Sequence, residues 1–298
     1  MTSLVQTAFG AADPTLDDGA GSAPGTGRTT VRLDVDETDR CFYDHPLDHI
    51  PGMLLVTALL DLVRAQVRDQ ADAGLNRLRI SLSFDRICEP GEPVMLHCEP
   101  APAAEGPAWQ LRAEQEGSTV CQAVVGLART PAAQPTGQAQ DRLQGQSQDQ
   151  DRTRPADAAL VHRHLAENIL LGAPLRTEES AVLVPPAGHR LHGGPDGLHT
   201  PDALIESARQ MSTLLAHTAH GREPDIQLLW LSLEADVPTD LPVSVPLSLR
   251  WEFTPARGAR APYPMALLDA RGGERLGGIA ITHHSMSRAR YQERRAAK

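Results

Sequence analysis

Two loops of this sequence place histidine just before a long helical pattern. In the first, Asp44-His45 and Asp48-His49 are followed at once by Pro51-Gly52-Met53 and an apolar run. An imidazole positioned beside a reacting group can act as a general acid or base. The amides at the start of a helix have no partner within the helix, and they favour developing negative charge. This loop therefore predicts an active site at the beginning of a helix.

A second loop repeats this arrangement more weakly. His199 precedes Thr200-Pro201-Asp202, and a helical pattern follows that contains Glu206, Arg209 and Gln210. The same plan used twice in one chain is a sign of internal repetition. The sequence therefore predicts two related halves, each with a loop that leads into a central helix.

The elements around the first loop predict an antiparallel sheet with one helix. Residues 30–35 alternate like a strand, and residues 53–68 carry a wide apolar face behind Pro51, which is tolerated in the first turn. Further strands are predicted at residues 78–84, 93–98, 109–113 and 119–128. This order favours an α+β fold over a βαβ alternation.

The second half follows a low-complexity linker and has the same order. Residues 158–171 look amphipathic, as a helix or a strand, and a helix is predicted from about Pro201 to Ala219. Strands are predicted at residues 225–233, 243–253, 264–268 and 277–282. We predict a double hotdog with a flexible tail (1–28), a first hotdog domain (29–130), a linker (131–157), a second hotdog domain (158–288) and a frayed basic tail (289–298).

Composition narrows the class of protein. The formal net charge of -10 argues against a nucleic-acid-binding protein. No signal peptide opens the sequence, no apolar run approaches the ~20 residues that span a bilayer, and the four cysteines lack metal-site spacing. We expect a cytoplasmic protein with free thiols, whose single lysine and abundant arginine and alanine are typical of an actinomycete.

The loop residues resemble those of the A-factor biosynthesis (AfsA-type) hotdog family. The resemblance lies in residues 44–55, in residues 160–163 with 167–171, and in the run from His199 through Glu206, Arg209 and Gln210 to His217. It implies γ-butyrolactone synthesis, in which a β-ketoacyl group passes from an acyl carrier protein to the hydroxyl of dihydroxyacetone phosphate. It implies no cofactor, and a distant relation to β-hydroxyacyl-thioester dehydratases.

The sequence departs from this family pattern in two ways. The half with the Asp-His-x-Pro-Gly-Met motif normally comes second, so the halves look exchanged. If Glu206 is aligned with Thr57, then Gln210 falls against Asp61. The first helix then lacks the carboxylate that the second helix has, and we expect one working site per chain.

The resemblance also implies roles for individual residues. His45 or His49 would act as the base, the amides of Gly52 and Met53 would hold the thioester oxygen, and Glu206 would orient the substrate or act as the acid. The residues expected to contact substrate are Asp44, Asp48, His199, Arg209 and Gln210. Arg209 could meet a phosphate, although an ion pair with Glu206 one turn away is the simpler interpretation.

Several alternatives stay open at this stage. The fold could support dehydration or related proton transfer on a polyketide intermediate, or a protein that binds an acyl group or ligand without turnover. His217 and His220 could share a metal ion, but no carboxylate or cysteine completes a recognisable site, so no metal is predicted. No membrane partner is expected, and the chain could pair further because hotdog sheets often do.

Overall fold

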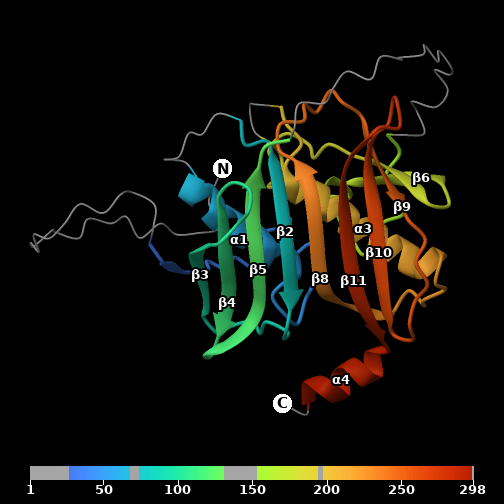
Figure 1. Ribbon diagram of the computed structural model, residues 1–298. Coiled ribbons are helices and arrows are strands. Elements are labelled where there is room, and N and C mark those ends of the chain that lie inside the picture. Colours follow the sequence, from blue (N-terminus) through green and yellow to red (C-terminus); the bar gives the residue numbers. More distant parts are fainter. Residues whose placement is uncertain (1–26, 68–73, 131–152, 194–196, 297–298) are drawn as a thin grey trace, which may run out of the picture.

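The computed structural model describes residues 27–67, 74–130, 153–193 and 197–296. Within these ranges, eleven strands form one antiparallel sheet in the order β1-β3-β4-β5-β2-β8-β11-β10-β9-β7-β6. Two long helices, α1 and α3, lie side by side behind this sheet in Figure 1, both on the same face. Among the described residues, no helix is both long and apolar enough to cross a membrane.

The described residues of the first half form one long helix and five strands. These are β1 (Thr29–Arg32), α1 (Gly52–Val67), β2 (Arg77–Phe84), β3 (Val94–Ala101), β4 (Ala108–Gln115) and β5 (Ser118–Ala128). The strands alternate buried and exposed residues because one face of the sheet packs on the helices and the other does not.

In the second half, the part of the chain that the structure describes adds six strands and two helices. These are β6 (Leu171–Arg176), β7 (Glu179–Val182), α3 (Pro201–Thr218), β8 (Gln227–Pro238), β9 (Leu247–Trp251), β10 (Arg260–Asp269), β11 (Arg275–Met286) and α4 (Arg288–Ala296), preceded by a short 3-10 helix (Ala166–Asn168). Outward from the β2–β8 junction, the order is β5-β4-β3-β1 on one side and β11-β10-β9-β7 on the other. This matching order confirms the predicted double hotdog.

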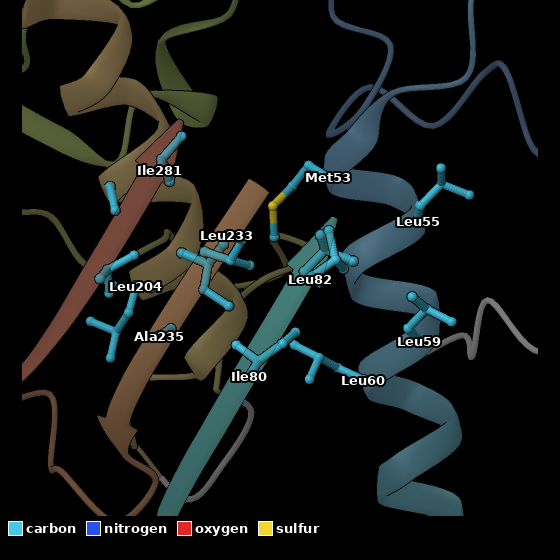
Figure 2. Packing of buried hydrophobic residues seen from close by; sticks show 14 of the residues in the cluster. Met53, Leu55, Leu59, Leu60, Ile80, Leu82, Leu204, Leu233, Ala235 and Ile281 are labelled. Atoms are coloured by element: carbon cyan, nitrogen blue, oxygen red, sulfur yellow. The ribbon is translucent and has the colours of Figure 1, made fainter. Parts of the chain in front are cut away.

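The two halves are joined through their sheets and a shared core. β2 pairs with β8 so that Ile80 lies opposite Ala235. Met53 and Leu60 point from α1 toward β2 in Figure 2, where Leu82 also lies. Each fully buried aliphatic side chain of this kind contributes about 1.5–3 kcal/mol relative to an exposed one. This common core fixes the position of each half relative to the other.

The two central helices bury different kinds of side chain. The buried face of α1 is apolar apart from Thr57. α3 buries a series of polar side chains, namely Asp202, Glu206, Ser207, Gln210, Ser212, Thr213 and His217. Because buried polar groups are costly unless they are hydrogen-bonded, this interior must be organised around specific contacts.

Two parts of the chain differ from the sequence prediction. Between β-bridge residue Pro155 and β6, the chain forms turns and one short 3-10 helix rather than a regular amphipathic element. The predicted frayed tail is wrong, because α4 begins at Arg288 and buries Tyr291. A helix with one apolar contact and many arginines has no hydrophobic periodicity by which it could be recognised.

Candidate active site

The first candidate base is paired with its neighbouring carboxylate. The Nδ1 atom of His45 lies 2.6 Å from Oδ1 of Asp44. The side chain of Asp44 is completely buried, whereas that of His45 is 26% exposed. An ionised carboxylate can only accept, so Nδ1 carries the hydrogen and Nε2 of the neutral ring is left as the basic atom.

Residues of the second half hold Asp44 in place. Its Oδ2 atom accepts hydrogen bonds from the backbone N–H of His164 (3.1 Å) and from Nδ2 of Asn168 (3.3 Å). Nη1 of Arg163 lies 3.6 Å from Oδ1 of Asp44 and donates to the carbonyl oxygen of Cys41. The Asp44–His45 pair is thus built across the boundary between the two halves.

Glu206 lies at the centre of a buried network of charges. Its Oε1 atom accepts from Nε (3.0 Å) and Nη2 (2.6 Å) of Arg163, and from Nη2 of Arg209 (2.8 Å). It also accepts from Nε2 of Gln210 (2.7 Å), and Oε2 accepts from Nε of Arg209 (2.7 Å). Four of these five contacts fall on Oε1 and one on Oε2, and the side chain is buried, so the carboxylate is bound within the protein and is not presented to solvent.

Electrostatics keep both carboxylates ionised. Burial by itself raises the pKa of Glu206, but the charges of Arg163 and Arg209 outweigh burial and lower the pKa to about 2. Burial likewise raises the pKa of Asp44, yet the hydrogen bond from His45 and the charge of Arg163 hold that pKa well below its usual range. Glu206 therefore cannot donate a proton near neutral pH.

Gln210 connects this network to the chain before β6. Its two amide hydrogens go to Glu206 and to the carbonyl oxygen of Asn168 (2.7 Å), and its Oε1 accepts from the N–H of Leu170 (2.9 Å). The side chain is fully buried. In this arrangement Gln210 positions the segment that contains Arg163 and Asn168.

The second candidate base has a different setting. Nδ1 of His49 lies 2.8 Å from Oδ1 of Asp48, whose side chain is 56% exposed. The same oxygen accepts from the hydroxyl of Tyr291 (2.9 Å) in α4. Of the two predicted bases, His45 is therefore the one that the structure brings to the Arg163–Glu206 network.

His199 is held by internal contacts. Its Nε2 atom lies 3.0 Å from the carbonyl oxygen of Val245, and the side chain is buried. His199 stands two residues before Pro201, as Ile50 stands two residues before Gly52, and Ile50 is also buried. The histidine thus occupies a core position of the loop. Thr200 caps α3 by accepting from the N–H of Ala203 (3.2 Å).

The start of α1 leaves two amides available. The N–H groups of Leu54 and Leu55 both donate to the carbonyl oxygen of Pro51. Within the described residues, those of Gly52 and Met53 make no hydrogen bond, as the predicted oxyanion site requires. A Cβ atom on Gly52 would lie 3.1 Å from Trp230 and 3.2 Å from Phe84, so only glycine fits here without a shift.

The two helices confirm the alignment on which the asymmetry rests. Thr57 follows the first residue of α1, Gly52, by five positions, and Glu206 follows the first residue of α3, Pro201, by the same number. The hydroxyl of Thr57 is buried and has no hydrogen-bond partner among the described residues. α1 therefore offers no carboxylate at the position equivalent to Glu206.

Replacing Thr57 by valine is expected to leave kcat unchanged. The buried hydroxyl makes no hydrogen bond, and an unsatisfied polar group costs about 1–3 kcal/mol, so the free energy of unfolding should stay the same or rise. Turnover and chemical denaturation measure the two quantities. A loss of turnover as large as that of a Glu206→Gln variant would contradict the asymmetric site.

A partly buried imidazole pair lies beside this network. Nε2 of His217 lies 2.9 Å from Nε2 of His162, and Nδ1 of His217 lies 2.8 Å from the carbonyl oxygen of Arg222. A carbonyl only accepts, so His217 carries its hydrogen on Nδ1, and in the neutral pair His162 donates from Nε2. His162 has a φ angle of 51°, a left-handed conformation that non-glycine residues adopt rarely and often at functional sites.

The His162 pair predicts a pH dependence of stability. Burial, followed by the charges of His217 and Arg209, lowers the pKa of His162 from 6.5 to about 4. As the pH falls below 6.5, His162 takes up a proton in the unfolded chain but stays neutral in the folded chain. The free energy of unfolding is therefore highest above pH 6.5 and declines toward pH 4. Asparagine tolerates the same left-handed backbone conformation. In a His162→Asn variant, the slope of the unfolding free energy against pH should therefore fall by about 1.4 kcal/mol per pH unit. Denaturation curves between pH 7.5 and 4.5 measure this slope; an unchanged slope would contradict it.

Sequence reasoning missed the residues that connect the halves. Arg163 and Asn168 were part of the family resemblance, but no role could be assigned to them, and the same holds for His162. The available signal was their position in the His-Arg and Glu-Asn segments that precede a strand. Within the described residues, no three His, Cys, Asp or Glu side chains converge as a metal site would require.

A known family model matches the second half of the chain. Residues 144–285 match the model of the A-factor biosynthesis hotdog domain. The second half is therefore similar to an A-factor biosynthesis hotdog domain. This match confirms the AfsA-type resemblance seen in the sequence, while the exchanged order of the halves stays a prediction.

A curated relative and several solved structures add to this picture. The chain is 34% identical to the 2-oxo-3-(phosphooxy)propyl 3-oxoalkanoate synthase of Streptomyces virginiae over 97 residues, so it spans about a third (32%) of that relative's length and 32% of its own. A tesB protein from Mycobacterium avium subsp. paratuberculosis aligns with a TM-score of 0.57 at 14% identity, over 89% of this chain and 95% of that one.

Two dehydratase domains are similar in structure. That of RzxB from Pseudomonas fluorescens has a TM-score of 0.55 at 16% identity, over 86% of this chain and 93% of that one. That of PpsC from Mycobacterium tuberculosis has a TM-score of 0.55 at 14% identity, over 90% and 96%. At such identities the likeness shows only the double hotdog fold, which this chain shares with these proteins.

Proposed function

We propose that the chain is an AfsA-type acyltransferase that moves a β-ketoacyl group from a carrier-bound thioester to the hydroxyl of a small phosphorylated alcohol such as dihydroxyacetone phosphate. The observation that carries this proposal is the contact of the Asp44–His45 pair with Arg163, which Glu206 holds in place. A base from one half and a fixed cation from the other form a single site. The family match and the name of the Streptomyces relative support the choice of reaction.

In the proposed reaction, His45 activates the alcohol. Nε2 takes the hydroxyl proton as the oxygen attacks the thioester carbonyl, and Asp44 stabilises the imidazolium that forms. The amides of Gly52 and Met53 hold the oxyanion of the tetrahedral intermediate. When the C–S bond breaks, the imidazolium returns the proton to the thiolate, which leaves an ester and a free carrier thiol.

The roles of Glu206 and Gln210 change in this proposal, whereas Arg209 keeps its predicted contact with phosphate. Glu206 and Gln210 become positioning residues, because both side chains are buried and hydrogen-bonded to other groups of the protein. Arg209 is 19% exposed and gives Nε and Nη2 to Glu206, so its Nη1 is the donor that we assign to the phosphate. Arg64 is excluded from this role because its guanidinium binds Asp61 and Asp202.

Incubation with a β-ketoacyl carrier thioester and dihydroxyacetone phosphate tests the proposal. Mass spectrometry should show an ester in which the β-ketoacyl group replaces the hydroxyl hydrogen of the phosphorylated alcohol, with release of the carrier thiol. In a parallel assay with a β-hydroxyacyl thioester, loss of water would instead identify a dehydratase. An unchanged thioester under saturating conditions would identify a binding protein and would contradict an acyltransferase.

A further inference from the structure

The C-terminal helix is attached to the loop that precedes α1. The hydroxyl of Tyr291, a buried residue of α4, donates to Oδ1 of Asp48 (2.9 Å). Arg295 donates from Nη2 to the carbonyl oxygen of Asp48 (2.7 Å) and from Nη1 to Glu89 (2.6 Å). α4 extends below the sheet at the end of β11 in Figure 1. One face of α4 is therefore fixed four residues before the amides that the proposed reaction uses.

The rest of α4 presents positive charge. Arg288, Arg290 and Arg294 are exposed, and within the described residues their side chains make no ion pair or hydrogen bond. Arg295 already engages the carboxylate of Glu89, and Glu293 is the one acidic residue in the helix. The chain as a whole carries a net charge of -10, so this concentration of arginine runs against its general character.

The positive charge of α4 affects the pKa of a neighbouring histidine. Burial, and then the charges of Arg294 and Arg290, lower the pKa of His284 in β11. Arg290 and Arg294 thus contribute positive charge close to His284 at the end of the sheet. A surface of this kind attracts a negatively charged partner and increases the rate at which the two meet.

We propose that α4 is the docking helix for an acidic acyl carrier protein that delivers the thioester; this inference rests on the proposed function. A partner bound to α4 would stand beside Asp48 and the start of α1, from where a flexible prosthetic arm can lead the thioester toward Gly52. A membrane is a poorer fit, because the one aromatic residue of α4, Tyr291, is buried and its exposed face has no large apolar side chain. A nucleic acid is also disfavoured as the partner, because the chain as a whole is acidic.

Charge reversal of two exposed arginines tests the docking helix. In an Arg290→Glu/Arg294→Glu variant, KM for a β-ketoacyl-loaded acyl carrier protein should rise about ten-fold or more, a factor that corresponds to about 1.4 kcal/mol. KM and kcat for a β-ketoacyl N-acetylcysteamine thioester should stay unchanged, because this small donor needs no docking surface. An Arg32→Glu/Arg250→Glu variant is the control, since it makes the same change of charge at exposed positions of β1 and β9.

Binding of a fluorescently labelled acyl carrier protein, followed by anisotropy, separates docking from catalysis. If wild-type protein binds the carrier and the α4 variant does not, the docking proposal is supported. If neither donor is turned over in addition, only the proposed acyltransferase function is contradicted. Equal affinity of both proteins for the carrier would overturn the proposal. It would also be overturned if the α4 variant lost affinity for anionic lipid vesicles or DNA and kept its affinity for the carrier.

Discussion

A Glu206→Gln variant should lose turnover and about 3–5 kcal/mol of unfolding free energy. The substitution leaves the guanidinium groups of Arg163 and Arg209 facing a neutral amide, and Arg163 is 6% exposed. A buried cation without its partner charge is strongly destabilising. The two hydrogen bonds that hold Arg163 against Asp44 would also be weakened, because the amide oxygen of glutamine is a neutral acceptor. Steady-state kinetics and chemical denaturation at neutral pH measure the two losses.

Stability and catalysis can be separated by removing the charge pair together. In an Arg163→Met/Glu206→Gln variant, no unpaired cation remains at position 163, so part of the unfolding free energy should return. Turnover should stay lost, because the contact with Asp44 is gone. Recovery of turnover in this double variant, or normal turnover by a folded Glu206→Gln protein, would show that the network has no part in catalysis.

A His45→Gln variant should lower kcat by about 10²–10⁴ with little change in melting temperature. The side chain is 26% exposed and its one hydrogen bond is to the adjacent Asp44, so the fold depends little on it. His49→Gln is the matched control, since His49 has an equivalent contact with Asp48 outside the Arg163–Glu206 network. A larger loss of kcat in the His49 variant would indicate that His49, in the second Asp–His pair, is the catalytic base.

The local patterns in the sequence predicted most of the fold. The apolar face of α1 and the alternating strands follow from spacings within single elements, and each was found within a few residues of its predicted position. The short strands β6 and β7 were missed because four to six residues give too little periodicity. α4 was missed because its stability depends on Tyr291 and Arg295 contacting a loop far away in the sequence.

The candidate site was predictable only in part for the same reason. Asp44-His45 and the Glu206–Gln210 spacing can be read locally, and the alignment of Glu206 with Thr57 is correct. The partner of both carboxylates is Arg163, which lies 43 residues from Glu206 in the sequence. No local spacing indicates such a contact, so Glu206 was expected to orient the substrate, whereas its carboxylate is buried and bound by Arg163, Arg209 and Gln210.

The central claim is that the Asp44–His45 pair and Arg163 act as one catalytic unit formed by both halves of the chain. A double-mutant cycle on kcat, with Asp44→Asn, Arg163→Lys and the two combined, tests it most directly. Residues that act as a unit have non-additive effects, so the double variant should lose no more than the worse single variant. If the two losses multiply instead, Asp44 and Arg163 act independently, and the composite site is contradicted.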